Sequence, residues 1–571
     1  MERALPTTLP GLGRRRSLGL EHFALTGAIV ALVVLVVLPL GSLVWGSLTE
    51  NGRLTLEHFR QAFSERLYFQ ALVNSLILGI WTGVLSIAIG LPMAWAVSRT
   101  DLPWKGFVRQ TANIAYITPP FLSAIAFVNL FSPNAGLINR FVRDVLGLPA
   151  LTFNIFSMRG LILVTVLHTF PFVFLLAGSA LESVDASLEE SAQILGSGRW
   201  RTALKIAAPL VAPSVLSGAL LAFVNAIALF GSQAIIGLPG RVFTLPTRIY
   251  TLFDYPPQYG LASALSLIFV AITVLALWLQ RRYLARRSYV TLAGKGLRPQ
   301  QIALGGARWV LLGFCAIVFV VAVVAPYLSL LAVSFSKSWG LTFWQNLTLA
   351  NYRFILFEYE VTRRAILNSL ILAAAAATLA VLLGSVISWV DLRTNLWGRR
   401  LLDYVSLVPL GLPGIVVAVA LLQFWLRVPL PLYGTLTIIL LAYVGRFIPL
   451  GVRAANAALR QVDPTLEETA RITGAGWLRT MHKVTLPLIQ PGLFAGWLLV
   501  FVPAIQELSA SILLFTSDSM TLAVAVYNLY ETGYGEAVAA LAILNMLIIS
   551  AAIGLATRLG RGGPAAQGAA S

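Results

Sequence analysis

The chain has 571 residues, of which 58% are hydrophobic and only 11% are charged, and its formal net charge is +18. Soluble globular proteins carry about 25% charged residues. This composition therefore excludes a water-soluble globular protein and indicates that most of the surface faces lipid. The single cysteine, Cys315, excludes an intramolecular disulfide and a thiolate metal site.

Twelve apolar stretches are close to the roughly 20 residues that a helix needs to cross the hydrocarbon of a bilayer. They lie at about 24–46, 70–97, 112–131, 159–181, 210–236, 261–280, 309–334, 365–390, 402–425, 432–452, 488–514 and 536–557. The third and the ninth are the weakest, because each contains two prolines. We expect an all-α integral membrane protein.

Basic residues divide unevenly between the two sets of loops. With the N-terminus inside the cell, the inside segments hold 27 Lys and Arg residues and the outside segments hold 13. Cytoplasmic loops carry the excess of Lys and Arg. The sequence therefore predicts that both termini are cytoplasmic, and that basic runs such as Arg14–Arg16 lie beside anionic lipid rather than on nucleic acid.

The chain repeats itself over nearly its whole length, which is best recognised before any fold is assigned. "NSLIL" occurs at Asn74 and again at Asn368, and "WAVSRTDL" at Trp95 matches "WVDLRTNL" at Trp389. Each repeat holds six spans, an even number, so the halves enter the membrane in the same sense as a parallel repeat. The expected divisions are a basic cytoplasmic tail (1–23), a first repeat (24–283, core about 70–283), a cytoplasmic linker (284–308), a second repeat (309–558, core about 364–558) and a C-terminal tail (559–571).

The closest internal match is a polar loop that follows the fourth span of each half. Between 184–213 and 462–491, fifteen of thirty positions are identical, whereas the flanking spans diverge more. Loops are ordinarily the variable part of a protein. Each copy predicts a short helix, a glycine hinge and a second short helix, in which the paired glutamates occupy the first turn. A solvated connector would not need this duplication, so we interpret the loops as levers that dock on a cytoplasmic partner.

The motif Glu-x-Ala, three residues, Gly, and a later hydrophobic-x-x-Pro resembles the EAA loop of permeases of ABC importers. The residues that carry it are Glu189, Glu190, Ala192, Gly196, Gly198 and Pro209 in the first copy, and Glu467, Glu468, Ala470, Gly474, Gly476 and Pro487 in the second. Ser191 and Thr469 replace the usual alanine. The resemblance covers about 54–557, and the fused arrangement is most similar to ferric-iron transport permeases, with fused thiamine permeases close to them.

The resemblance implies a type I importer fold, two copies of an ABC ATPase subunit docked on the two loops, and a periplasmic or lipid-anchored substrate-binding protein. It also implies a multi-pass location in the bacterial plasma (inner) membrane. Ferric iron is the leading cargo, and thiamine, polyamine or phosphonate are alternatives. A secondary active transporter is the alternative from another class, although acidic residues inside the spans are nearly absent.

No cofactor or metal site is expected on this chain, and it is not expected to be an enzyme. An ATPase would need G-x-x-x-x-G-K-[ST] to hold phosphates, and Gly294-Lys295 does not meet that pattern. Catalytic residues are not expected.

Five polar residues inside spans are candidates for the translocation path, because ionisable groups in the hydrocarbon are expensive. They are His168, Arg446, Glu507, Asn74 and Asn368. A structural role, hydrogen bonding between helices, is equally open for Arg446 and Glu507 and is favoured for the two asparagines.

Overall fold

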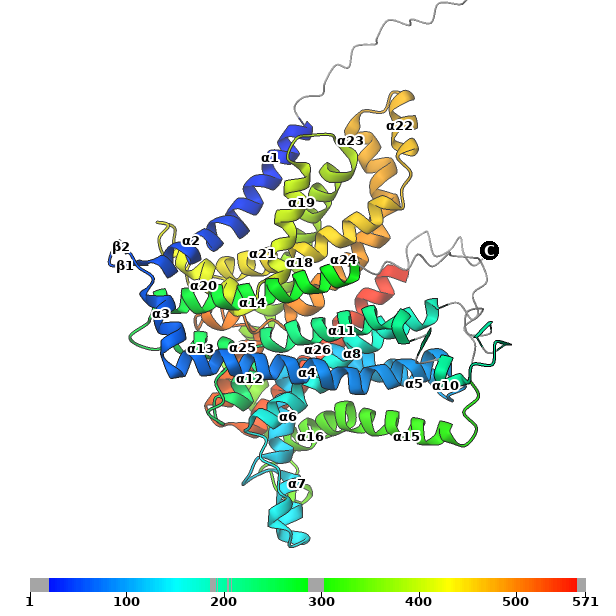
Figure 1. Ribbon diagram of the computed structural model, residues 1–571. Helices are drawn as coiled ribbons and strands as arrows, with labels where there is room; N and C mark the ends of the chain where they lie inside the picture. The colour runs from blue at the N-terminus through cyan, green and yellow to red at the C-terminus, as the bar shows by residue number, and fades with distance from the viewer. Residues whose placement is uncertain are drawn as a thin grey trace, which may run out of the picture.

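The computed structural model describes residues 20–184, 191–192, 194–202, 205–206, 208–285 and 302–561. Almost all of them are helical, as the apolar stretches predicted. The two halves run in the same sense, with α10 and α22 on one side of the molecule and β1 and β2 on the opposite side, while α7 projects at the bottom of the view (Figure 1). We call the first the loop end and the second the hairpin end.

The elements of the first half are α1 (Leu20–Leu32), η1 (Val33–Val37), α2 (Leu38–Leu48), β1 (Thr49–Glu50), β2 (Arg53–Leu54), α3 (Glu57–Ser64), α4 (Arg66–Arg99), α5 (Lys105–Ile117), α6 (Pro120–Phe131), α7 (Leu137–Arg140), η2 (Phe141–Val145), η3 (Pro149–Leu151), α8 (Met158–Ser183), α10 (Arg199–Thr202), α11 (Ala208–Ala228), α12 (Gly231–Gly237), α13 (Leu245–Thr251) and α14 (Tyr259–Ala285). Strands β1 and β2 pair antiparallel, Thr49 with Leu54 and Glu50 with Arg53. Asn51 and Gly52 both have positive φ in the turn, the conformation that a two-residue hairpin favours.

The elements of the second half are α15 (Ala307–Phe319), η5 (Val320–Val324), α16 (Ala325–Ser334), η6 (Phe343–Gln345), α17 (Ala350–Arg353), η7 (Phe354–Glu358), α18 (Glu360–Arg393), α19 (Arg399–Leu407), η8 (Val408–Gly411), α20 (Gly414–Trp425), α21 (Leu436–Arg460), α22 (Pro464–Ile472), α23 (Trp477–Thr480), η9 (Met481–Thr485), α24 (Leu486–Ile505), η10 (Ser511–Leu513), α25 (Leu522–Glu531) and α26 (Gly535–Arg561). The order repeats that of the first half. In each half the core packs three long helices together, α4 with α8 and α11, and α18 with α21 and α24.

Ten helices in the described residues are long and apolar enough to span a membrane, and two bent pairs raise the number to as many as twelve. The third and ninth expected spans are these bent pairs: α5 and α6 meet at 98°, and the helix over Arg399–Gly411 meets α20 at 113°. Proline blocks the helix at each break, since it lacks an amide hydrogen and restricts the preceding residue.

The fifth and eleventh spans are shorter than the sequence predicted. They were expected at 210–236 and 488–514, but α11 ends at Ala228 and α24 ends at Ile505. Beyond these points the chain turns into short helical segments, α12 in the first half and η10 in the second. These segments pack mainly on helices of their own half, α12 on α6 and α8 and α25 on α18 and α26, and ring contacts of Phe230 and Tyr250 with Tyr527 join the two halves.

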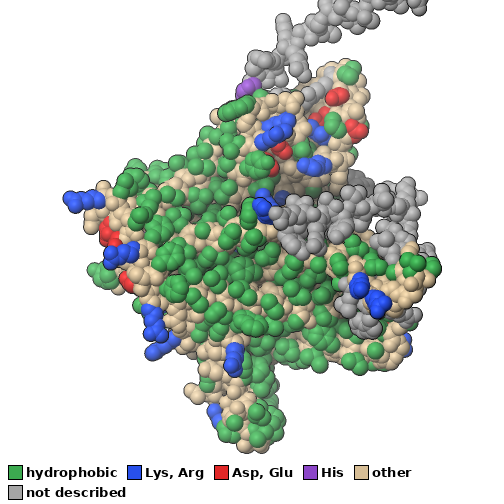
Figure 2. Space-filling view, viewed as in Figure 1, with side chains coloured by type: hydrophobic (Ala, Val, Ile, Leu, Met, Phe, Trp, Pro, Cys, Tyr) green, Lys and Arg blue, Asp and Glu red, His purple; other side chains and the backbone are tan. Residues whose placement is uncertain are grey.

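The surface agrees with a membrane location. Figure 2 shows hydrophobic side chains over the broad middle of the molecule, with Lys and Arg gathered mainly at its margins. A band of exposed apolar side chains between two charged zones is the arrangement that a bilayer requires.

The first span of each half bridges to the other half. Helix α2 packs against α14 of its own half and α20 of the other, and α16 packs against α26 and α6 in the same way. The hydroxyl of Ser42 donates to the carbonyl of Ala420 at 3.1 Å, and the hydroxyl of Ser329 donates to that of Ala126 at 3.2 Å. The repeat aligns Ser42 with Ser329 and Ala126 with Ala420, so the two contacts are equivalent. Each half thus packs its first span on a helix of the other half, an arrangement that we call the exchange of first spans.

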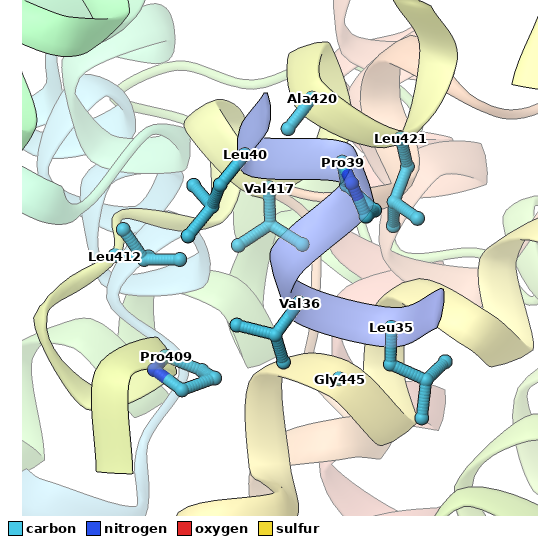
Figure 3. Close-up of a pocket in the computed structure, with 10 residues that line it drawn as sticks. All are labelled: Leu35, Val36, Pro39, Leu40, Pro409, Leu412, Val417, Ala420, Leu421 and Gly445. Atoms are coloured by element: carbon cyan, nitrogen blue, oxygen red, sulfur yellow. The ribbon is translucent and has the colours of Figure 1, made fainter. Parts of the chain in front are cut away.

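A small apolar pocket lies where the first span meets α20 and α21 (Figure 3). It is lined by Leu35, Val36, Pro39, Leu40, Pro409, Leu412, Val417, Ala420, Leu421 and Gly445. With only apolar side chains around it, this pocket has nothing to recognise a charged cargo.

Candidate functional site

The second polar loop is built around a capped helix. Asp463 precedes α22 and its carboxylate accepts a hydrogen bond from the amide of Thr465 at 2.9 Å. Hydrogen bonds from Thr465 lower the pKa of Asp463 below its ordinary value. Pro464 occupies the first helical position, where the missing amide hydrogen is harmless. The cap fixes where the helix begins at the loop end.

Gly474 ends α22 and turns the chain. Its φ is +89°, and the amide of Ala475 donates to the carbonyl of Ala470 at 3.0 Å. This is the glycine-terminated helix end that a left-handed residue makes possible. The first copy has the same geometry: φ of Gly196 is +79°, and Ser197 donates to Ala192 at 2.9 Å.

The second short helix of each loop continues into the next span. Thr480 donates to the carbonyl of Gly476 at 3.0 Å, and Thr202 to that of Gly198 at the same distance. In the second half α23 then runs through η9 into α24, one span over Trp477–Ile505. The sequence predicted a second short helix and a separate span, expected at 488–514 in this half. Instead Pro487 lies in the first turn of α24 and Pro209 near the start of α11, positions that a helix tolerates.

Glu467 is buried and paired, although the sequence placed it only as a first-turn acid. It is 5% exposed, and its carboxylate lies 3.3 Å from Nε of Arg393 and accepts a hydrogen bond from Thr485 at 3.1 Å. Arg393 also donates to the carbonyls of Leu459 and Val462 at 3.2 and 2.7 Å. The guanidinium of Arg393 therefore joins the end of α18 to the residues before the loop and to α22 within it. Glu468, the next residue after Glu467, is exposed.

The first copy preserves the same anchor as far as it is described. Arg99, which the repeat aligns with Arg393, donates to the carbonyl of Val184 at 3.1 Å, the counterpart of Val462. Glu189 and Glu190 lie outside the described residues. The two arginines were missed as functional residues, although their repeated "RT" was visible in the sequence.

Each loop presents an apolar side chain to solvent at the same place. Ile194 is 85% exposed and Ile472 is 86% exposed, and the repeat aligns them. Both precede the hinge glycine of their copy. An exposed isoleucine at the tip of a rigid helix is the kind of group that fills a groove on a partner.

Each of the two candidate asparagines lies on the second span of its repeat and binds the backbone just before a short helix of the same repeat. Asn74 donates to the carbonyl of Phe243 at 2.8 Å, and Asn368 donates to those of Asp518 and Met520 at 3.0 Å. The serines that follow them accept from the amides of Leu245 and Leu522. These contacts hold the start of α13 and of α25 against the second span of each half.

Arg446 and Glu507 form a buried ion pair. Their charged atoms lie 2.8 Å apart, and the Glu507 side chain is 7% exposed. Glu507 also accepts from the amide of Ala510 at 2.9 Å. A Cβ on Gly414 would collide with the Arg446 guanidinium, so this side chain fills the break at the start of α20.

His168 occupies the equivalent position in the first half without a carboxylate partner, because Leu229 aligns with Glu507. Its ring stacks on Tyr116 with centroids 6.3 Å apart, beside the break between α5 and α6. The side-chain Nε2 of Gln506 donates to the carbonyl of Ile117 at this same break, at 3.3 Å. The structure thus places both basic residues at broken spans, and among the residues that it describes a charge pair forms there in the second half only. Among the described residues, no three His, Cys, Asp or Glu side chains gather as metal ligands would.

Comparison with known proteins identifies the architecture. The family described as "Binding-protein-dependent transport system inner membrane component" matches residues 68–289 and 380–562. The chain belongs to this family. It is a multi-pass inner-membrane permease subunit of an ABC importer, and the family's domain is present twice.

Three curated relatives align with this permease, two of them over most of its length. A ferric transport system permease protein of Actinobacillus pleuropneumoniae is 27% identical over 92% of this chain and 77% of its own. A putative ferric transport system permease protein of Haemophilus influenzae is 28% identical over 82% and 73%. A molybdenum transport system permease protein of Escherichia coli is 31% identical over 37% of this chain and 93% of its own.

Proposed function

We propose that this permease imports ferric iron and is driven by two copies of a cytoplasmic ATPase subunit carried on other chains. The observation that carries the coupling is the duplicated loop, whose hinge, anchor and exposed isoleucine recur in both halves at the loop end. The cargo rests on the ferric relatives that align over most of the chain. The loop end and both termini face the cytoplasm in this proposal, in keeping with the excess of basic residues in those segments.

The loops act as levers. A lever transmits a push only if it is stiff, and the second loop is stiffened by its cap, by the hydrogen bond from Ala475 to Ala470 that closes α22, and by the Arg393–Glu467 pair. Because Arg393 ends α18, a displacement of α22 is passed directly to the second span of that half. Closure of the ATPase subunits on ATP would draw the two loops together and open the hairpin end. Release of the hydrolysis products would reverse the motion.

A substrate-binding protein delivers the cargo at the hairpin end. Helices α13 and α25, one from each half, lie together toward this side (Figure 1), so the same face can receive a partner that contacts both halves. The chain itself carries no phosphate-binding loop of the Walker type, so energy must come from the partner subunits.

The test is a mild-detergent purification of the tagged permease from its own host, analysed by mass spectrometry. We expect an ATPase subunit to co-purify with the wild type and to be lost from the Ile194→Asp/Ile472→Asp double variant. The matched control is Leu54→Asp, which places the same charge on an exposed leucine at the hairpin end and should keep the ATPase. Transport that persists after ATP depletion, with no ATPase recovered, would contradict the proposal and favour a secondary transporter.

The cargo is tested by uptake into cells that lack the chromosomal gene and carry it on a plasmid. Radioactive ferric iron should enter only when the permease is present, and thiamine, a polyamine or a phosphonate should not compete. Uptake of one of these compounds, with no uptake of iron, would contradict ferric iron as the cargo but would not contradict the importer mechanism.

A further inference from the structure

The connection between the third and fourth spans of the first half is a structured projection. Residues 132–157 join α6 to α8 and contain α7, η2 and η3, whereas 426–435 make the equivalent connection between α20 and α21 in the second half. Figure 1 shows α7 beyond the end of α6, away from the body of the molecule. We call residues 132–157 the foot. Because the connection in the second half is much shorter, the foot belongs to one half alone.

The direction of α6 keeps the foot at the membrane. Helix α5 packs on α8 and α4, two of the spans, and lies alongside α4 in Figure 1. Helix α6 meets α5 at 98° and therefore leaves the direction of the spans almost at a right angle. It runs nearly parallel to the plane of the bilayer, with α7 beyond it. A segment reached in this way stays level with the bilayer instead of standing out into water.

The tip of the foot presents apolar side chains to its surroundings. Leu151 is 69% exposed and Val145 is 59% exposed, and Phe141, Leu146 and Leu148 are exposed as well. Figure 2 shows hydrophobic side chains over the tip and along one flank of the foot toward the apolar surface of the body. That surface faces lipid, so the foot continues the contact with lipid beyond the spans. A docking face for a transient protein partner would be about as polar as any protein surface.

The backbone of the foot is hydrogen-bonded internally by one buried side chain. Asn139 is 1% exposed, and its side-chain nitrogen donates to the carbonyls of Phe131, Ser132 and Phe153 at 2.9, 3.1 and 2.7 Å. Its side-chain oxygen accepts from the amide of Phe153 at 2.9 Å. Backbone polar groups at membrane depth need partners within the protein, since water is not there to bind them. Asn139 thus equips an irregular segment to lie against lipid.

Charged groups lie on the foot beside its apolar residues. Nε of Arg143 lies 2.8 Å from the Asp144 carboxylate, and Nε of Arg140 lies 3.9 Å from it. Two cations share one anion, so the foot keeps one unbalanced positive charge, and all three side chains are partly exposed. An amphipathic segment with basic groups on one face and Phe and Leu on the other is typical of a membrane interface.

We propose that the foot lies in the interface of the outer leaflet, with Phe141, Val145 and Leu151 among the acyl chains and Arg140 and Arg143 at the phosphates of phospholipid headgroups. The contact with lipid does not depend on the proposed function, and only the choice of leaflet rests on the orientation proposed above. Because the foot continues α6, the leaflet supports the first broken span from the side. The connection after the second broken span is much shorter, so this support is one-sided.

The test measures the depth of the foot in a bilayer. The Val145→Cys variant is made in a Cys315→Ala background, which removes the one native thiol, and is labelled with the fluorophore NBD. The full-length permease is then placed in nanodiscs whose phospholipids carry bromine on their acyl chains, where bromine quenches only nearby fluorophores. Glu50→Cys, on the exposed turn side of β1, is the matched control. We expect quenching to be at least about twofold stronger at 145 than at 50, because an interfacial element lies about 5–10 Å into the boundary between headgroups and chains.

Equal quenching at the two positions would overturn the inference, because the foot would then be no closer to lipid than the hairpin is. The substrate-binding protein of the host tests the other occupant. A label at Val145→Cys that bromine does not quench, and whose emission moves to shorter wavelength when that protein is added, would assign the foot to the protein and reject lipid.

The leaflet is tested separately with a membrane-impermeant maleimide added to spheroplasts. Reaction of Glu50→Cys before lysis would support the outer leaflet, because the foot and the hairpin both connect spans on the same side. Reaction only after lysis would overturn the outer-leaflet assignment and the proposed orientation together. The bromine measurement needs neither transport nor ATP hydrolysis, so its failure is distinct from a failure of the proposed function.

Discussion

Arg446 and Glu507 illustrate what a single residue position can and cannot reveal before folding. Both stand out in the sequence as ionisable groups in apolar spans, but they are 61 positions apart and nothing along the chain pairs them. The roles of Arg99 and Arg393 are harder still to recognise from the sequence, since an arginine near a span end is expected beside lipid headgroups. Only the folded chain shows that Arg393 reaches the buried Glu467 and two loop carbonyls.

The repeat itself suggests how to test the ion pair of the second half. Arg446→Met leaves the Glu507 carboxylate buried without its counter-ion, and we expect a loss of about 3–5 kcal/mol in the free energy of unfolding. Arg446→His with Glu507→Leu copies the residues of the first half, His168 and Leu229, and should restore most of that stability. Thermal unfolding in detergent measures both variants. Equal losses in the single and the double variant would show that the pair does not act as a unit.

At the scale of elements, the hinge of each loop was predictable and the shape of the broken spans was not. A glycine after a capped helix specifies a turn, and Gly474 makes the turn that its sequence position indicates. The prolines of 112–131 and 402–425 marked weak spans, but bends of 98° and 113° depend on how α6 and α20 pack against the rest of the fold. The ends of α11 and α24 were missed for a similar reason, since apolar residues continue beyond them among the polar ones.

Two glycines two positions apart should respond differently to substitution. The φ of Gly474 is +89°, which proline cannot adopt, whereas Gly476 has a φ of −66° and open space around its Cα. We expect Gly196→Pro with Gly474→Pro to leave membrane insertion intact and to abolish uptake, because the lever loses its turn. Gly476→Ala should transport as well as the wild type. Uptake assays normalised to the amount of inserted permease compare them, and normal uptake by the double proline variant would refute the lever.

At the scale of the whole molecule, the sequence was sufficient for the repeat and for the ten spanning helices and two bent pairs that the described residues contain. It was not sufficient for the exchange of the first spans, because lipid is as apolar as another helix and an apolar face does not specify its neighbour. Ser42 and Ser329 were visible as a repeated serine, yet their acceptors lie at Ala420 and Ala126, far along the chain.

The exchange predicts how the chain behaves when it is divided. A cut placed within 286–301, outside the described residues, should yield two fragments that co-purify in equal amounts and restore uptake when produced together. Each fragment alone should aggregate or be degraded, because α2 or α16 then lacks the surface of the other half. Affinity purification through a tag on one fragment tests this, and a stable, monodisperse first half would contradict it.

The contact between Ser42 and Ala420 also has a consequence for biosynthesis. The two residues are separated by 378 positions, so the first span enters the bilayer long before its neighbour leaves the ribosome. During that interval its inner face must be shielded by lipid or by the insertion machinery, and the first half cannot reach its final packing. Quality control in the membrane therefore has to tolerate a half-made permease. A premature stop anywhere before α20 leaves α2 without the helix that it packs against.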